Sequence, residues 1–388
     1  MGMDIRYKSS NQKMEIKPTV VFLNIRGKAK KGGQEVTINK LIEGLNKAYS
    51  ITYIGHKKDI NYENVIYPFT PLLKLLPIKR GFGKLLRISL FRYMFLRKVK
   101  LNCDIIVMNG KSDYTFLLRN KNYIKYKSVL IIKHGRFQSP YPDIIIKNKN
   151  YRIVVLNSNE EKKLESIYGA EKIKLIRTGA ESSDYNINRD VRRKFGIPDR
   201  SYVILSIGRL EEDQKRFSDG IYAIKLATET NKDLVYVIIG DGIDKPKYEK
   251  LIKKLNLQNN VKLLGRVSED DKKGFLNESS ILLITSAWET LGLTMVEAFR
   301  SHLPVLTTKT DGSLDAVKDV YNGFFTTGNP EDIANKILNI RNLPKEKLKE
   351  IAENAYRTAN LYSYNKMISL YKSIIEELTD SKDKITKV

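Results

Sequence analysis

Short apolar runs recur along the whole chain, each followed by a loop and then by an amphipathic stretch. The runs lack polar alternation, which is typical of parallel strands covered on both faces. The first series lies at residues 19–23, 51–54, 105–108, 129–132 and 153–156. The second series lies at residues 203–207, 235–239, 261–264, 281–284 and 305–307. Strands that alternate with helices in two series predict an α/β protein with two doubly wound domains.

The length of 388 residues also favours two domains, because a single hydrophobic core stops growing below this size. The polar segment 181–200 is the expected linker. We therefore expect an N-terminal domain over residues 15–182 and a C-terminal domain over residues 183–360. Residues 345–378 have helical propensity, and we expect the tail, 361–388, to return as a helix to the first domain.

Composition narrows the functional classes. The formal charge of +25 favours a polyanionic partner such as nucleic acid, anionic lipid or a phosphorylated substrate, although a compositional bias toward lysine would produce the same excess. The single cysteine, Cys103, excludes an intrachain disulfide and is expected to be a buried structural thiol. Three histidines and one cysteine argue against a zinc cluster. The cysteine usage fits a cytoplasmic, reducing location best. No apolar run is long enough to span a membrane, and residues 1–14 lack the apolar centre of a signal peptide.

Candidate chemistry begins at the end of the first strand in the second series. Gly208 and Arg209 follow that strand, and Lys215 comes six residues later. A glycine lets the backbone approach a ligand, and the two cations suit a diphosphate. The same residues would equally form an ordinary turn with a surface arginine.

The next two strands also end in glycine-containing loops. Gly240, Asp241 and Gly242 follow one strand, and Arg266 and Val267 follow Gly265 at the end of the other. The backbone of the second loop could face a nucleobase. A tight turn is the simpler interpretation of the first.

The segment from Glu289 to Glu297 carries the most specific signal. Gly292 is expected to begin a helix, so the backbone amides of Leu291, Gly292 and Leu293 can hold a phosphate. Glu289 precedes this helix end and can accept hydrogen bonds from sugar hydroxyls, and Glu297 can reach a second pair, such as those of ribose. The alternative makes Glu289 a cap residue and Glu297 a solvated glutamate.

The ordered set resembles glycosyltransferase family 4, a group of retaining enzymes with the GT-B fold. The resemblance covers about residues 202–341 and rests on Gly208–Leu210 with Lys215, Gly240–Gly242, Gly265, Glu289–Glu297, Pro304–Val305 and Gly312. The first half resembles the family more loosely, through Gly32–Glu35, His134–Gly135 and Asn157–Ser158. It implies two Rossmann-like domains facing across a cleft, with the acceptor in the first and the nucleotide-sugar donor in the second.

The resemblance also implies roles for individual residues. Arg209 and Lys215 would contact the donor diphosphate, Glu297 the ribose, Glu289 the transferred sugar, and the backbone of 291–293 the phosphate. Gly32 and Gly33 would lie by the diphosphate and acceptor, and His134 near the sugar. The implied activity is hexosyl transfer, with retention, from a UDP- or GDP-sugar. The implied enzyme has no obligatory metal or other cofactor, and the sequence has no Asp-x-Asp motif in a suitable context.

Several positions depart from the family pattern. The usual two-glycine turn reads Asp311-Gly312, and the glutamate that follows it is replaced by Asp315. His302 replaces a glycine at an expected helix end, where a left-handed conformation is needed. The junction motif reads Gly179-Ala180-Glu181. These departures leave the expected fold intact and bear on how the donor is recognised.

A basic, apolar stretch in the first domain suggests where the acceptor is found. Residues 64–103 contain nine basic side chains and no acidic one. Interleaved leucines and aromatics predict one or two cationic amphipathic helices that could lie on an anionic membrane. A core-packed helix with solvated cations is the alternative. A nucleic-acid partner is not favoured, because no binding module is recognisable.

These patterns predict a peripheral enzyme of the cytoplasmic membrane face that glycosylates a lipid-linked or other glycan acceptor. Two other functions fit the same scaffold. One is a GT-B phosphorylase or epimerase, and the other is a non-catalytic protein that binds polyanions through its basic surface.

Overall fold

The computed structural model describes residues 17–24, 33–55, 65–66, 101–109, 111–119, 124–132, 146–147, 149–180 and 190–380. The chain divides into two compact units. Unit 1 comprises residues 1–155, 161–176 and 367–388, and unit 2 comprises residues 156–160 and 177–366. Each unit is built on its own parallel sheet.

Unit 1 contains a seven-stranded sheet in the order β3-β2-β1-β4-β5-β6-β7. All of its described strand pairs are parallel. The strands are β1 (Thr19–Asn24), β2 (Ser50–Gly55), β3 (Val65–Ile66), β4 (Leu101–Met108), β5 (Ile124–Ile132), β6 (Asn150–Val155) and β7 (Ile173–Leu175). The helices are α1 (Gly33–Leu45), α3 (Lys111–Arg119), α5 (Ser158–Tyr168), the 3₁₀ turn η3 (Ala170–Lys172) and α15 (Tyr364–Asp380). Strand order reverses between β1 and β4, as in a doubly wound fold.

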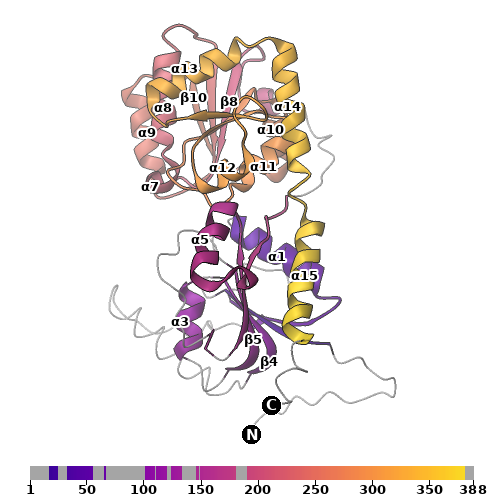
Figure 1. Ribbon diagram of the computed structural model, residues 1–388. Coiled ribbons are helices and arrows are strands. Elements are labelled where there is room, and N and C mark those ends of the chain that lie inside the picture. The colour runs from indigo at the N-terminus through magenta and orange to yellow at the C-terminus, as the bar shows by residue number, and fades with distance from the viewer. Residues whose placement is uncertain are drawn as a thin grey trace, which may run out of the picture. The chain divides into compact units, whose positions relative to one another are not determined.

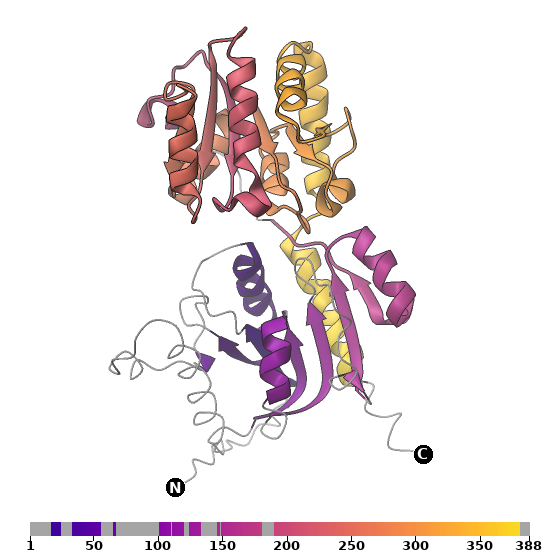
Figure 2. The same ribbon diagram turned by 90° about the vertical axis from the view of Figure 1, so that its left-hand side faces the viewer.

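The last helix, α15, packs on the sheet of unit 1 although it comes from the far end of the chain (Figure 2). Ser128 on β5 donates from Oγ to the carbonyl of Leu378 over 3.0 Å. Arg152 on β6 forms an ion pair with Glu377. Tyr371 of α15 is 1% exposed, so the helix contributes a large side chain to the core. The amphipathic pattern of the tail therefore has its apolar face buried against this sheet.

Unit 2 contains a six-stranded parallel sheet in the order β10-β9-β8-β11-β12-β13. The strands are β8 (Tyr202–Ile207), β9 (Leu234–Ile239), β10 (Val261–Gly265), β11 (Ile281–Ile284), β12 (Val305–Thr308) and β13 (Phe324–Thr326). The helices are α6 (Val191–Lys194), α7 (Glu212–Lys215), α8 (Phe217–Ala227), α9 (Lys245–Lys254), α10 (Glu269–Glu278), α11 (Leu293–Arg300), α12 (Asp311–Ala316), α13 (Pro330–Arg341) and α14 (Lys345–Ala359). The predicted class of two doubly wound α/β domains is confirmed.

Helices cover both faces of this second sheet, which explains the uninterrupted apolar runs. Val203 and Leu205 of β8 pack into a core with α10, α11 and α14. Ile204 faces the other way, into a core with α8, α9 and α13. In Figure 1 these two groups of helices lie on opposite sides of β8 and β10. Because successive side chains of a strand alternate between faces, a sheet buried on both sides needs an apolar residue at every position.

Two segments differ from their predicted form. The expected linker contains α6, because Val191 and Ile197 are buried in the core of unit 2 and tie this stretch to α10. The helical tail is broken between α14 and α15. At the break Ala180 forms a parallel bridge with Ser363, and the buried guanidinium of Arg300 donates to the carbonyl of Tyr362 over 2.9 Å. These contacts take the backbone groups that a continuous helix would use itself.

His302, which stands where the family pattern has glycine, adopts a left-handed backbone with φ of 52°. The turn after α11 closes with the Leu303 amide donating to the Ala298 carbonyl over 2.9 Å. The imidazole stacks on Tyr356 of α14, with ring centroids 4.2 Å apart. Contact with an aromatic ring offsets part of the strain that a side chain creates in this conformation.

Asp315 on α12, also a departure from the family pattern, is the centre of a polar network inside unit 2. Its side chain is 5% exposed and accepts hydrogen bonds from Arg177 Nε over 2.6 Å and from Ser158 Oγ over 2.5 Å. Burial alone would raise the pKa of Asp315, but the guanidinium and the hydroxyl hold it below the usual aspartate value. The network joins α12 to two segments that are distant in sequence.

Three further expectations concern the cysteine, membrane-spanning helices and the basic amphipathic stretch. Cys103 is buried, as predicted, and burial with the nearby Asp104 carboxylate raises the pKa of its thiol to about 12. No helix among the described residues combines the length and the apolar character that crossing a membrane requires. Most of the basic amphipathic stretch, residues 67–100, lies outside the described residues.

Asp315→Asn is expected to destabilise the protein by about 2 kcal/mol at pH 7, because it removes the charge that compensates a part-buried guanidinium. For a unit of this size the midpoint of thermal unfolding should fall by roughly 4–8 °C. Asp311→Asn on the same helix is the matched control, since Asp311 is exposed. Equal midpoints for the Asp315 variant and the unaltered chain would contradict a structural role for the network.

The effect should depend on pH in a defined direction. A carboxyl whose pKa is lowered in the folded state stabilises the protein above its unfolded pKa, near 4, and loses that contribution as pH falls through its folded pKa. Thermal melts should therefore separate Asp315→Asn from the unaltered chain above about pH 5, and the two should converge as the pH falls through the lowered folded pKa of Asp315.

Candidate functional site

The loops that follow β8 and β9 are in direct backbone contact. Gly208 donates from its amide to the Ile239 carbonyl over 3.0 Å. Gly240 has φ of 145°, and a Cβ at this position would lie 1.8 Å from the Gly208 carbonyl oxygen. A Cβ on Gly242 would lie 2.3 Å from the Leu210 carbonyl oxygen. The glycines therefore allow two loops at the carboxyl edge of the sheet to pack together, where doubly wound domains bind ligands.

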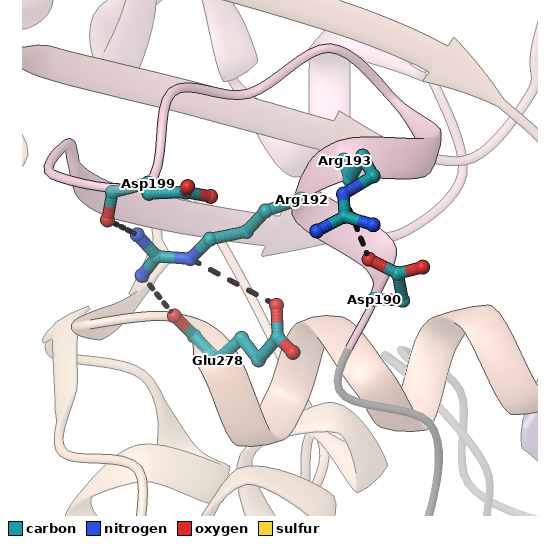
Figure 3. A pocket seen from close by; sticks show the side chains of 5 residues that line it. All are labelled: Asp190, Arg192, Arg193, Asp199 and Glu278. Carbon is teal, nitrogen blue, oxygen red and sulfur yellow. Dashed lines mark hydrogen bonds and ion pairs between the residues drawn. The ribbon is translucent and has the colours of Figure 1, made fainter.

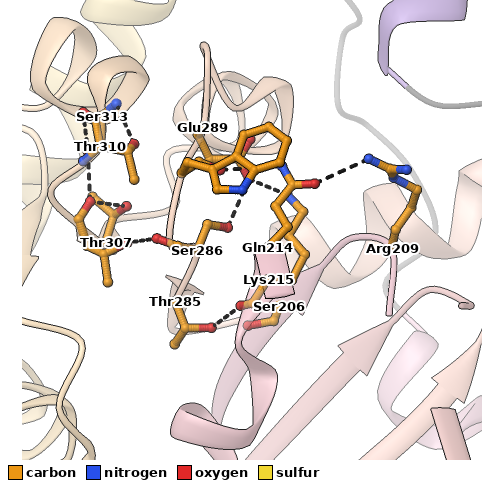
Figure 4. Close-up of polar contacts among 12 residues, drawn as sticks. Ser206, Arg209, Gln214, Lys215, Thr285, Ser286, Glu289, Thr307, Thr310 and Ser313 are labelled. Atoms are coloured by element: carbon orange, nitrogen blue, oxygen red, sulfur yellow. Dashed lines mark hydrogen bonds and ion pairs between the residues drawn. The ribbon is translucent and has the colours of Figure 1, made fainter. Parts of the chain in front are cut away.

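Arg209 projects from the first of these loops and is half exposed, with 51% of its side chain accessible. Its two terminal nitrogens each lie 3.2 Å from an acceptor, Glu211 Oε1 and Gln214 Oε1. Figure 4 shows the guanidinium directed at the side-chain amide of Gln214. Gln214 in turn donates to the Trp288 carbonyl over 3.3 Å. Arg209 is thus connected to the loop that follows β11.

Lys215, at the end of α7, and Glu289, after β11, form an ion pair. Both side chains are largely buried, with 16% and 13% of their surface exposed. Ser286 also donates to Glu289 Oε1 over 2.9 Å, and Thr285 donates to the Lys215 carbonyl over 2.7 Å (Figure 4). Each charge compensates the other away from bulk water, so the pair fixes both side chains at this edge.

The backbone around Glu289 is braced from two sides. Gly312 donates from its amide to the Glu289 carbonyl over 3.0 Å, and a Cβ on Gly312 would lie 2.6 Å from Leu291 Cα. Asn157 donates from Nδ2 to the Thr290 carbonyl over 2.8 Å. The retained glycine of the Asp311-Gly312 turn is therefore the one that the loop needs for close approach.

Gly292 is the residue before α11 and has φ of 78°. Its left-handed conformation turns the chain into the helix, and no side chain caps this helix end. Leu291 is 4% exposed and packs in the core, and Leu293 packs partly against it. The amides of the first turn of α11 carry the positive end of the helix dipole, which favours an anion.

Glu297, in the middle of α11, is 27% exposed and lies 3.1 Å from the amine of Lys272 on α10. Lys272 also lies 2.8 Å from Glu269 on its own helix. Burial would lower the pKa of Lys272, but the carboxylates of Glu297 and Glu269 together raise it above its usual value. Glu297 is thus not a simple solvated helix glutamate.

Asp241 and Arg266 lie on the loops after β9 and β10, 3.9 Å apart and both at least half exposed. Gly240 donates to the Gly265 carbonyl over 2.8 Å, which holds these loops side by side. Val267 packs against the core. An exposed pair at this distance contributes little stability, so both side chains can turn toward a ligand.

The site candidates in the first domain are Gly32, Gly33 and His134, and only Gly33 is among the described residues. Gly33 is the first residue of α1, whereas Gly32 and His134 lie outside the described residues. In the part of the chain that the structure describes, no group of three or more histidine, cysteine or acidic side chains is arranged to hold a metal ion.

A separate polar pocket lies at α6 and the end of α10 (Figure 3). Arg192 fills much of it and donates to the carbonyls of Asp199 and Ser201 over 2.8 and 3.1 Å. Its guanidinium also reaches the Glu278 carbonyl. This arginine satisfies backbone groups before β8 and at the end of α10, so the pocket has a structural explanation and contains none of the predicted donor residues.

Three residues of the site were not singled out from the sequence. Ser286 stands three residues before Glu289, a serine–glutamate spacing common at helix starts that could have marked it. Gln214 directly precedes Lys215, but a glutamine has no distinctive signal. Lys272 is followed by Lys273, and the sequence does not tell which of the two reaches Glu297.

Residues 188–358 match the family described as Glycosyl transferases group 1. The chain is 31% identical over 215 residues to "Uncharacterized glycosyltransferase MJ1059" of Methanocaldococcus jannaschii, a match that covers 53% of the chain and 50% of that relative. It is 29% identical to MJ1178 of the same organism, which is named in the same way, over 90% of the chain and 95% of the relative. It is 26% identical to the alpha-monoglucosyldiacylglycerol synthase of Acholeplasma laidlawii, over 91% and 95%.

Solved structures resemble the whole fold. A sucrose-phosphate synthase from Thermosynechococcus elongatus superimposes with a TM-score of 0.75 at 16% identity, covering 94% of this chain and all of that one. Anabaena Alr3699/HepE, solved with UDP and glucose, gives a TM-score of 0.69 at 19% identity, covering 92% and 99%. The group 1 match, the relatives and these GT-B neighbours together support a glycosyltransferase with two Rossmann-like domains.

Proposed function

We propose that the protein is a retaining hexosyltransferase that uses a nucleotide-diphosphate sugar, with UDP or GDP as the carrier. The donor would bind in the second domain, 183–360, and the acceptor in the first, 15–182. The donor half of the proposal is supported by relatives named as sugar transferases and by a structural neighbour solved with UDP and glucose. Retention follows from the resemblance to family 4.

The observation that carries the proposal is the buried ion pair between Lys215 and Glu289. A donor sugar presents hydroxyls and a diphosphate side by side, and this pair offers a carboxylate acceptor and a cation side by side. Ser286 holds the same carboxylate oxygen as the lysine over 2.9 Å. The pair is therefore organised before any donor arrives, which is the condition for electrostatic catalysis.

The bond between the sugar and the diphosphate breaks, and the diphosphate leaves with the electron pair. The anomeric carbon then bonds to an acceptor hydroxyl oxygen, whose proton passes to the departing phosphate oxygen. The growing negative charge of the diphosphate would be compensated by Lys215, by the half-exposed Arg209 and by the amides at the start of α11, residues 291–293. Glu289 would accept hydrogen bonds from the sugar. Glu297 would accept them from the ribose, and the loops at Gly240–Gly242 and Arg266–Val267 would border the nucleotide.

The first test is turnover of UDP-, GDP- and ADP-sugars, measured as nucleotide release with and without an acceptor. Arg209→Ala, Lys215→Ala and Glu289→Ala should each lower kcat by about 10²–10³-fold, because each removes a preorganised electrostatic group. Lys225→Ala, an exposed lysine of α8, is the matched control and should leave kcat unchanged. The anomer of the product, read by NMR, tests retention.

Four results would contradict the proposal. If no nucleoside diphosphate binds, the protein has no donor site of the proposed kind. Product formation that depends on added phosphate would indicate a phosphorylase, and conversion of the donor sugar without an acceptor would indicate an epimerase. Salt-sensitive binding of nucleic acid without sugar turnover would favour the polyanion-binding alternative.

We further propose that the acceptor is lipid-linked or presented at the cytoplasmic face of an anionic membrane. Support comes from the cationic amphipathic sequence of residues 64–103 and from the relative named alpha-monoglucosyldiacylglycerol synthase. Apolar side chains would insert into the interface while the cations meet anionic head groups.

Co-sedimentation with vesicles tests the membrane half. Changing Arg87, Arg92 and Arg97 to Glu should lower partitioning onto vesicles rich in phosphatidylglycerol by about 100-fold, since each cation near the surface contributes about 1 kcal/mol. Changing Lys225, Lys250 and Lys254, which are exposed in unit 2, to Glu alters the formal charge by the same amount. This control variant should lower partitioning onto the vesicles much less. Equal losses for the two triple variants would mean that net charge alone, and not this segment, drives binding.

A further inference from the structure

Lys272 occupies an unusual position for a lysine. It lies one turn inside α10, four residues after the Ser268 cap, and only 20% of its side chain is exposed. The helix follows the loop of Arg266 and Val267. A buried amine is costly unless opposite charges compensate it, so its partners define what it does.

Its two partners differ in their surroundings. Glu269 is on the same helix, one turn back, and 77% exposed, so this contact resembles an ordinary surface pair. Glu297 is on the next helix, α11, and 27% exposed. The contact with Glu297, 3.1 Å long, therefore joins two helices across a partly dry surface, and the two carboxylates keep the amine charged.

The two helices are themselves held in place by the core. Phe275 and Leu276 of α10 pack in one cluster with Val296 and Phe299 of α11. Lys272 and Glu297 thus lie within a few positions of buried core side chains on their own helices. Substitution of the Lys272 side chain should therefore change the position of the Glu297 carboxylate and leave the two helices in place.

We propose that Lys272 is a positioning residue that holds the Glu297 carboxylate where it accepts hydrogen bonds from the ribose hydroxyls, so that Lys272 sets the preference for ribonucleotides over 2′-deoxyribonucleotides. This inference rests on the proposed function, because it assigns the ribose to Glu297. It adds a residue on a different helix that acts through its contact with Glu297.

The physical basis is preorganisation of a flexible side chain. A glutamate has three rotatable bonds, and an exposed one samples many directions. A charge-assisted hydrogen bond from Lys272 to Oε1 selects one direction before the nucleotide binds. A fixed carboxylate discriminates between a sugar that has the hydroxyl and one that lacks it, because only the first repays desolvation of the oxygens.

The test compares affinity for UDP, GDP and ADP with that for their 2′-deoxy forms by titration calorimetry on the full chain. Lys272→Met should narrow the preference for the ribonucleotide by about tenfold, the size of one modest hydrogen bond. Lys272→Arg should restore most of the preference, since it keeps the charge. Glu269→Gln should change the preference little, because it leaves the contact with Glu297.

Lys273→Met is the matched control, because it removes a positive charge from the neighbouring position of α10. It should leave the preference unchanged. Thermal midpoints recorded for all variants separate a loss of fold from a loss of discrimination.

Several outcomes would overturn the inference. If Lys272→Met weakens ribo- and deoxyribonucleotides by the same factor, the lysine has only a structural role. If the variant binds ribonucleotides more tightly, the lysine competes with the ribose for Glu297. If the unaltered chain binds none of the three nucleoside diphosphates, the proposed function fails and this inference fails with it, whereas intact binding with an unchanged preference in the variant defeats this inference alone.

Discussion

Mutual compensation of two largely buried charges, on Lys215 and Glu289, is the constraint around which the candidate site is organised. The lysine ends α7 and the glutamate follows β11, so the pair ties together loops from two adjacent strands of the second sheet. Neither charge would tolerate this environment without the other. The surrounding hydrogen bonds from Thr285 and Ser286, and the glycine contact beneath Glu289, all serve to keep the two groups together.

The fold class could be predicted because its signals are local. Each long central strand is an apolar run, and a sheet covered on both faces leaves no other interpretation of such runs. Short edge strands such as β7 and β13 were missed, since three residues give no period to detect. The contacts at the break before α15 could not be predicted, because they depend on Arg300 and Ala180, which are distant in sequence.

The candidate site divides in the same way. Glycines and charged residues at strand ends are visible in the sequence, and the geometry brings those of the second unit to one edge of its sheet; their roles stay predictions. Lys272 was not predictable, because a contact between side chains of separate helices has no signature in residue spacing. Gln214 was not predictable because a glutamine has no distinctive signal. His302 and Asp315, which depart from the family pattern, contact residues that are distant in sequence: His302 stacks on Tyr356, and Asp315 accepts hydrogen bonds from Arg177 and Ser158.

The placement of α15 has a consequence for biosynthesis. Ser128 and Arg152 of the first sheet form contacts with Leu378 and Glu377, which are synthesised after all of unit 2. Residues 177–366 form one uninterrupted stretch of unit 2, whereas unit 1 lacks α15 until these residues have been synthesised. Domains usually fold in the order of synthesis. Here the second domain can fold first, and the nascent first domain keeps an apolar sheet face uncovered until α15 has been synthesised.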